Sequence, residues 1–243
     1  MPVTIRRSRA ATVRRSAPAA AGLLLASCAA GPADAPGGAA GKVDAPMSAA
    51  RPGALAVACE NLRALADYPG VVLQGERIAA GALSVAGAPV AEHCRVTGRL
   101  NERTSTVDGQ RYAIGFEMRL PQAWNGRFFY QANGGLDGNV VPATGLVTSG
   151  PASATALAQG FAVISSDAGH GAAQNGSFGV DPEARLDYGY RAVAVLTPFA
   201  KAMIRAAYGR APDRSYIGGC SNGGRHTLVA AARGSTVPGS PTR

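Results

Sequence analysis

The sequence predicts an α/β fold, in which helices cover a sheet of parallel strands. A continuous apolar run at residues 161–164 is typical of a strand buried on both faces. Apolar residues then recur every three or four positions from Leu196 to Tyr208, which predicts a helix that ends at Gly209. A short strand at residues 215–217 leads through a glycine-flanked turn into another helix. This alternation of strands and helices is typical of a parallel α/β sheet.

The residues before this unit predict further strands and helices. The spacing of apolar residues indicates three strands, at residues 94–100, 112–118 and 127–132. Composition indicates three helices: a short one after Cys59, one at residues 154–159 and one at residues 224–233. We divide the chain into a signal peptide (1–27), an Ala/Gly/Pro-rich flexible tether (28–55), the folded part (56–233) and an unrelated tail (234–243).

The positive charge of the chain is concentrated at its start. The formal net charge is +9, and five arginines before residue 16 account for more than half of it. They precede a short apolar stretch with Leu23-Leu24-Leu25, as in a secretory signal. We find no basic stripe with interleaved aromatic residues, so we expect no nucleic-acid partner.

The signal ends in Leu25-Ala26-Ser27-Cys28, which resembles a bacterial lipobox. In that interpretation Cys28 is lipidated, and the lipid is the only membrane contact; an ordinary signal peptide with an incidental Cys28 is the alternative. Either way we expect an exported protein, periplasmic, anchored to the outer membrane or secreted, whose cysteines meet an oxidising compartment. Three cysteines remain after Cys28. We expect Cys59 and Cys94 to form a disulfide, and Cys220 to be left over because three is an odd number.

Ser221 is the candidate catalytic residue. It lies in Gly219-Cys220-Ser221-Asn222-Gly223, between a predicted strand and a predicted helix, as the nucleophile elbow of an α/β-hydrolase requires. An elbow centred on Cys220 would have Asn222 in place of the second glycine, so the spacing favours the serine. A glycine-rich turn without chemistry is the alternative.

An ester hydrolase also needs two N–H groups that stabilise the negative charge on the substrate oxygen. One is expected from the backbone of Asn222, the residue after the nucleophile. The second is expected from Gly134-Gly135, a pair that follows a predicted strand, although an ordinary tight turn would have the same sequence.

Four motifs together resemble the tannase and feruloyl esterase family over about residues 56–233. The motifs are Cys220-Ser221-x-Gly223-Gly224-Arg225, Trp124-Asn125-Gly126-Arg127-Phe128 before the Gly-Gly-x-Asp-Gly loop, Ser166-Asp167-x-Gly169-His170, and His93-Cys94-Arg95-Val96-x-Gly98. The resemblance implies a serine carboxylesterase that acts on esters of aromatic acids through an acyl-enzyme. It assigns Ser221 as nucleophile, Gly135 and Asn222 as oxyanion-hole residues, and Cys59 with Cys94 as a disulfide.

The same resemblance implies features that we expect to be missing from this chain. In the family the catalytic Asp and His follow a lid domain that often carries calcium, and the partner of Cys220 lies beside that His. None of these is recognisable after Ser221, so this would be a C-terminally truncated member with only the N-terminal part of the fold. No cofactor is required by the chemistry itself.

The three histidines present are poor substitutes for the missing base. His93 adjoins Cys94 and is interpreted as structural; His170 follows a strand end near Asp167, at the edge of the site; and His226 is expected to point away from the Ser221 hydroxyl. A serine without an adjacent base is a weak nucleophile. We therefore expect an esterase by family whose present chain is inactive. The alternatives are a non-catalytic truncated lipoprotein or pseudogene product, and a small binding lipoprotein that uses the Gly-Gly loop.

Overall fold

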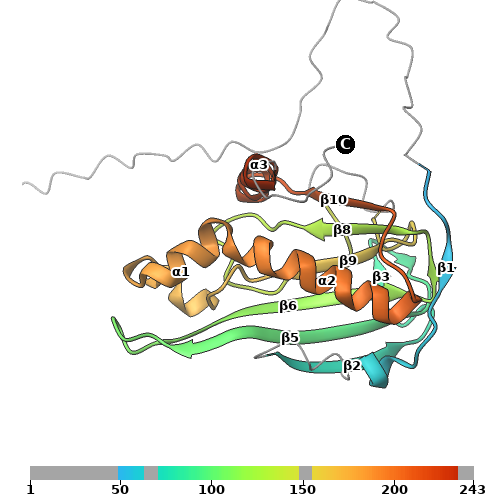
Figure 1. The fold of residues 1–243 in the computed structure, drawn as a ribbon, viewed down its shortest axis with the longest axis horizontal. Helices are drawn as coiled ribbons and strands as arrows, with labels where there is room; N and C mark the ends of the chain where they lie inside the picture. The colour runs from blue at the N-terminus through green and yellow to red at the C-terminus, as the bar shows by residue number, and fades with distance from the viewer. Residues whose placement is uncertain (1–48, 63–70, 148–154, 235–243) are drawn as a thin grey trace, which may run out of the picture.

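A six-stranded sheet is the centre of the fold in the computed structural model, which describes residues 49–62, 71–147 and 155–234. Its strand order is β10-β8-β9-β6-β5-β2 (Figure 1). The strands of this sheet are β2 (Val72–Ile78), β5 (His93–Thr104), β6 (Arg111–Pro121), β8 (Arg127–Gln131), β9 (Ala162–Ser166) and β10 (Arg214–Gly218). Two small pairs accompany it: β1 (Gly53–Ala54) with β7 (Ala123–Trp124), and β3 (Ser84–Val85) with β4 (Ala88–Pro89).

The sheet is mixed rather than parallel throughout. β8 pairs in parallel with both β9 and β10, as the alternation of strands and helices predicted. β6, β5 and β2 are antiparallel to their neighbours. The parallel pairing expected from the strand and helix unit is therefore confirmed for β8, β9 and β10, and the strands before β8 in the chain form an antiparallel half. Consecutive strands β5 and β6 are joined by a short turn at residues 105–110, and a turn of that length can connect only antiparallel neighbours.

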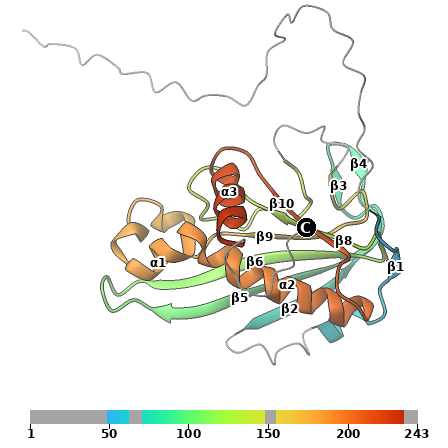
Figure 2. The ribbon, with the colours of Figure 1, turned by 45° about the horizontal axis from the view of Figure 1, so that its top comes forward.

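Helices pack on one face of the sheet (Figures 1 and 2). The helical elements are η2 (Ala172–Gln174), η3 (Phe178–Val180), α1 (Pro182–Leu186), a π-helical turn η4 (Asp187–Arg191), α2 (Ala192–Tyr208) and α3 (Asn222–Gly234). The predicted stripe of α2 is buried, and its C-cap Gly209 has φ +71°, which the absence of a Cβ allows. No helix among the described residues is long and apolar enough to cross a membrane.

The main core lies between α2 and the sheet. Phe199 of α2 meets Phe116 of β6 edge to face, with ring centroids 5.0 Å apart. Tyr208 stacks on Trp124 at 4.4 Å, and its hydroxyl donates to the Pro121 carbonyl. A smaller cluster covers the opposite face and includes Phe161 and Val163 with residues of the β3–β4 region. β9 is buried on both faces, as its apolar run predicted.

Several other predictions concern single segments. Residues 156–159 of the expected helix 154–159 form turns, because the chain reverses at Gly160 (φ +82°) before β9. The expected tether is ordered over its last residues, since Gly53 and Ala54 form β1 and Leu55 packs against the core. Residues 59–62 form a short 3-10 helix, as expected. β2 and the helical turns between residues 172 and 191 were not anticipated. The predicted signal peptide, Cys28 and the tail after Gly234 lie outside the described residues.

Cys59 and Cys94 form a disulfide, with their Cα atoms 5.4 Å apart. The expectation for Cys220 was wrong, because Cys220 is not a free thiol in the structure. The Cys59–Cys94 bond ties the segment before β2 to the buried strand β5. A Cβ on Gly75 of β2 would lie 2.3 Å from the Cys59 carbonyl oxygen, so the three segments are closely packed here.

Replacing both Cys59 and Cys94 by serine should lower the free energy of unfolding. The bond spans 35 residues, and loop-closure entropy predicts a loss of about 3–4 kcal/mol. Urea unfolding of the double variant beside the oxidised wild type measures this loss. An unchanged midpoint in the double variant would contradict the prediction.

Candidate active site

Ser221 occupies a sharp turn between β10 and α3. Its φ is +56°, a left-handed conformation that residues with a Cβ adopt only when the surroundings impose it. The turn is fixed at each end, because Gly223 N donates to Cys220 O and Arg225 N donates to Ser221 O. Ser221 is exposed, so its hydroxyl is accessible at the end of the sheet. The structure thus places Ser221 as the motif predicted.

The two glycines that flank Ser221 are required by a close contact with the end of β8. A Cβ on Gly219 would lie 2.2 Å from Ala132 O, and one on Gly223 would lie 2.3 Å from the same oxygen. Neither distance is possible for a real side chain. The elbow is also joined to β8 by a hydrogen bond from Ala132 N to Gly218 O. Both glycines therefore serve the packing of the turn.

The Gly134-Gly135 loop lies against the elbow. A Cβ on Gly134 would be 3.5 Å from Cys220 O, in ordinary contact. Gly135 has φ +65° and open space around its Cα, so the backbone there is accessible from solvent. Asn222 is the first residue of α3, and its N–H is one of the donors that a helix N-terminus leaves without an intrahelical acceptor. The two predicted oxyanion-hole residues are therefore brought to the same end of the sheet as Ser221.

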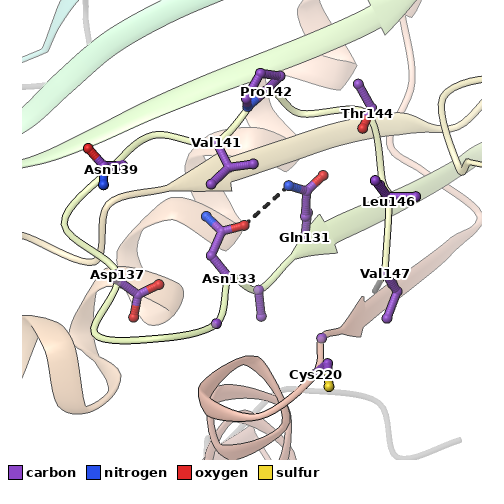
Figure 3. Close-up of a pocket in the computed structure, with 13 residues that line it drawn as sticks. Gln131, Asn133, Asp137, Asn139, Val141, Pro142, Thr144, Leu146, Val147 and Cys220 are labelled. Carbon is purple, nitrogen blue, oxygen red and sulfur yellow. Dashed lines mark hydrogen bonds between the residues drawn. The ribbon is translucent and has the colours of Figure 1, made fainter. Parts of the chain in front are cut away.

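A cavity of about 420 Å³ opens beside this elbow (Figure 3). Its floor is made by Gln131 and Asn133, and the loop from Asp137 to Val147 passes around them. The lining residues are Gln131, Ala132, Asn133, Gly134, Asp137, Asn139, Val141, Pro142, Thr144, Leu146, Val147, Gly219 and Cys220. Asp137 is the only charged residue among them. The cavity is thus largely apolar with a few amide groups, as a pocket for a small organic ligand commonly is.

The polar groups of the floor are held in place by hydrogen bonds. Gln131 donates to Asn133 and accepts a bond from Gly145 N at 2.7 Å. Asn133 donates to Ser165 Oγ and to the Ser166 carbonyl of the neighbouring strand β9. These bonds fix the orientation of both amides and tie the loop that carries Thr144 to the sheet. Sequence reasoning did not find Gln131 or Asn133, because an amide at a strand end is common.

The described residues offer Ser221 no adjacent base. The Ser221 hydroxyl makes no hydrogen bond within residues 49–62, 71–147 and 155–234. His93 is buried in the sheet between Ala91 O and Arg119, which agrees with the prediction that it is a structural residue. His170 contacts Asn175 at 2.9 Å and stacks on Phe178, and it is not among the residues that line the cavity beside the elbow. Burial lowers the pKa of both histidines.

His226 contacts the buried Asp137 at 2.9 Å, and it makes no hydrogen bond to Ser221 among the described residues. Sequence reasoning did not single out this pair. The only available signal was the Asp of the Gly-Gly-x-Asp-Gly loop, which the motif places close to the elbow.

A second carboxyl, Asp167, lies at the end of β9 beside the same loop. Its Oδ1 accepts bonds from Gly115 N and Gly169 N, both at 2.9 Å, and its carbonyl accepts a bond from Gly138 N. Burial raises the pKa of Asp167 to about 7, although Arg99 and the two N–H donors oppose this shift. Asp167 therefore changes charge near neutral pH.

The described part of the chain holds no group of three or more His, Cys, Asp or Glu side chains that could bind a metal ion.

Comparison with known proteins agrees with this geometry. A sequence profile described as tannase and feruloyl esterase matches residues 94–236, more than half of the chain. The mono(2-hydroxyethyl) terephthalate hydrolase of Piscinibacter sakaiensis is 41% identical over 158 residues, which cover 62% of this chain and 26% of that protein. A probable feruloyl esterase B-2 of Aspergillus flavus is 34% identical over 121 residues, or 50% of this chain and 22% of that protein. The chain thus spans about a quarter of these relatives.

Solved structures show the same relationship. The crystal structure of feruloyl esterase B from Aspergillus oryzae superposes with a TM-score of 0.57 at 27% identity, over 71% of this chain and 33% of that chain. The described residues therefore form part of an α/β-hydrolase fold. The family profile ends at residue 236, just after α3, so the elbow lies close to the end of the matched region.

Replacing Ser221 by glycine should stabilise the protein relative to Ser221→Ala. Both variants remove the hydroxyl, but only glycine adopts φ +56° without strain, a difference of about 1 kcal/mol. Urea unfolding of the two variants measures it directly. An alanine variant as stable as the glycine variant would show that the turn is not strained.

Asp167→Asn should flatten the pH dependence of stability between about pH 4 and pH 7. In wild type the folded state keeps a proton that the unfolded carboxyl has released, so the free energy of unfolding falls as pH rises, by up to ~1.4 kcal/mol per pH unit. Asparagine accepts the same two N–H bonds and does not titrate. Unfolding curves from pH 4.5 to 8 provide the measurement.

The control for this experiment is Asp108→Asn in the turn between β5 and β6. Hydrogen bonds lower the pKa of Asp108, so its replacement should leave the fall between pH 4.5 and 8 intact. Equal pH profiles for wild type and Asp167→Asn would contradict the assignment.

Proposed function

Because this chain belongs to the tannase and feruloyl esterase family, we propose that it is a carboxylic ester hydrolase for esters of small aromatic acids, with Ser221 as the nucleophile. The observation that carries the proposal is the left-handed Ser221 in a turn where only glycine fits at positions 219 and 223. A turn under such strain is typical of a nucleophile elbow. The matched relatives are named as esterases and hydrolases, which supports the same class of reaction.

The proposed reaction proceeds through an acyl-enzyme. The Ser221 oxygen attacks the ester carbonyl, its proton passes to a base, and the N–H groups of Gly135 and Asn222 bind the resulting oxyanion. The intermediate collapses, the alcohol leaves with a proton, and the acyl group remains on Ser221 until water releases the acid. The first turn of α3 favours the oxyanion further, because a helix N-terminus carries partial positive charge.

The base is the one component that the described residues do not supply. Ser221 has no histidine within hydrogen-bond reach among them, since His93, His170 and His226 are all engaged elsewhere. We therefore propose that these 243 residues by themselves turn over esters poorly, and that the reaction needs an Asp and a His from additional sequence.

The other expectations remain part of this proposal. The ligand would be a small neutral or weakly polar aromatic ester, no cofactor would be required, and no nucleic acid would bind. The protein would be exported, with a lipid on Cys28 as its only membrane contact. The calcium of the family would belong to additional lid sequence and not to the residues described above.

A chimera tests the proposed function. Residues 1–233 of this chain are joined to the sequence that follows the matched region in the Piscinibacter sakaiensis relative, and hydrolysis of a 4-nitrophenyl ester is followed by absorbance. We expect hydrolysis by the chimera that Ser221→Ala reduces by at least about a thousand-fold. A folded chimera without Ser221-dependent hydrolysis would refute the proposed function.

The 243-residue chain itself is the second arm. We expect its hydrolysis to equal that of its own Ser221→Ala variant, because a hydroxyl without a base is a weak nucleophile. Clear Ser221-dependent turnover by this chain alone would contradict the proposal that the base comes from additional sequence.

A further inference from the structure

Asp137 lies in the exposed loop after β8, yet its carboxyl group is buried. The neighbouring Leu136 is 49% exposed, whereas the Asp137 side chain is only 2% exposed. The loop contains three residues with positive φ: Gly135 at +65°, Asp137 at +58° and Gly138 at +82°. Such a backbone persists only where contacts hold it, and Asp137 itself lacks the freedom of a glycine. The buried Asp137 carboxylate provides such a contact.

Both partners of this carboxylate lie on the first turns of α3. Asp137 Oδ2 accepts a bond from Asn222 Nδ2 at 2.6 Å and contacts His226 Nε2 at 2.9 Å. Asn222 and His226 are four residues apart, so their side chains share one face of the helix. Asn222 Nδ2 and Arg225 Nη2 also lie 3.4 Å and 3.2 Å from the same ring nitrogen of His226. One oxygen atom thus joins the loop to the helix that begins after the nucleophile.

The other end of the Asn222 amide is equally constrained. Its Oδ1 accepts bonds from the Tyr188 hydroxyl at 3.1 Å and from Arg225 Nε at 2.6 Å. Arg225 lies over the Tyr188 ring at 4.4 Å and donates to the carbonyls of Tyr188 and Gly189. These donors fix the amide with its nitrogen toward Asp137. A continuous set of bonds therefore runs from the loop through α3 to η4.

We propose that Asp137 is a positioning residue that sets the distance between the two oxyanion donors. Gly135 precedes it by two residues in the loop, and the Asn222 backbone belongs to the residue whose side chain Asp137 binds. Fixing the side chain of Asn222 to Asp137 therefore fixes the Gly135 N–H relative to the Asn222 N–H. This inference rests on the proposed function for its catalytic meaning, but the bond between loop and helix can be tested without any turnover.

Hydrogen exchange of the 243-residue chain, followed by mass spectrometry, tests that bond. In Asp137→Ala we expect amides in two segments, residues 134–138 and 221–224, to exchange about ten-fold faster than in wild type. Asp137→Asn should stay close to wild type, because its side-chain oxygen accepts the same bond from Asn222. Asn222→Ala keeps the backbone N–H but removes the other partner of the bond, so it should also accelerate exchange at residues 134–138.

The matched control is Asp108→Ala. Asp108 is also a turn carboxylate, and it accepts bonds from Gln110 and Tyr112 in the turn between β5 and β6. Its loss should not change exchange at the loop or the elbow. Unchanged exchange at both segments in Asp137→Ala, or a uniform rise over the whole chain, would overturn the proposal; Asn222→Ala gives the same decision if Asp137→Ala does not fold.

The chimera described above separates this inference from the proposed function. There we expect Asp137→Ala to lower kcat by about ten- to hundred-fold with little change in KM, and Asp137→Asn to restore most of kcat. A chimera with no Ser221-dependent activity would refute the proposed function. The exchange experiment would still show whether the Asp137–Asn222 bond holds the loop to α3. An active chimera in which Asp137→Ala keeps full kcat would refute the positioning role.

Discussion

The contact between the elbow and the Ala132 carbonyl is the constraint on which the candidate site depends. Two glycines from different arms of the turn approach this single oxygen, and no other residue type fits at either position. The contact brings β10 and α3 against the end of β8, where the chain continues directly into the Gly134-Gly135 loop. The position of Ser221 relative to that loop is therefore decided by backbone packing. Side-chain bonds then refine it.

The walls of the neighbouring cavity also depend on the sheet, because side chains of its strands bind the backbone of the loop that forms these walls. Gln131 of β8 accepts a bond from Gly145 N, and Glu117 of β6 accepts one from Ala143 N. Both acceptors are buried, so these bonds are shielded from water and the loop has few alternative positions. The shape of the cavity is thus a property of the strands beneath it. The loop sequence could change on its exposed side without altering that support.

Sequence reasoning predicted the elements whose signal is local. The β9 run, the apolar stripe of α2 and the elbow at Ser221 each depend on neighbouring residues, and the structure has all three. It missed features that depend on distant segments. The antiparallel half of the sheet follows from how strands pair, and β2 has an exposed, alternating pattern with little apolar character. Asp137 looked like an ordinary loop residue because its partners lie about 85 positions later in the chain.

Composition misled where tertiary contacts override it. The alanine-rich residues 155–159 have helical propensity, but a reversal before β9 leaves no room for a helix. The tether shows the opposite error. Gly53 and Ala54 have little to bury, yet they pair with β7 at the edge of the core, and Arg51 there forms an ion pair with Asp213. Neither outcome can be read from the residues alone.

The parallel pairing of β8 with β10 also bears on the order in which the protein assembles. Arg127 is in register with Arg214, and β9, α1 and α2 all lie between them in the chain. Bringing such distant strands together is slow compared with closing the turn between β5 and β6. The left-handed Ser221 can be held only once β10 has docked on β8. During synthesis from the ribosome, the left-handed turn at Ser221 is therefore expected to form late, on a sheet that is already in place.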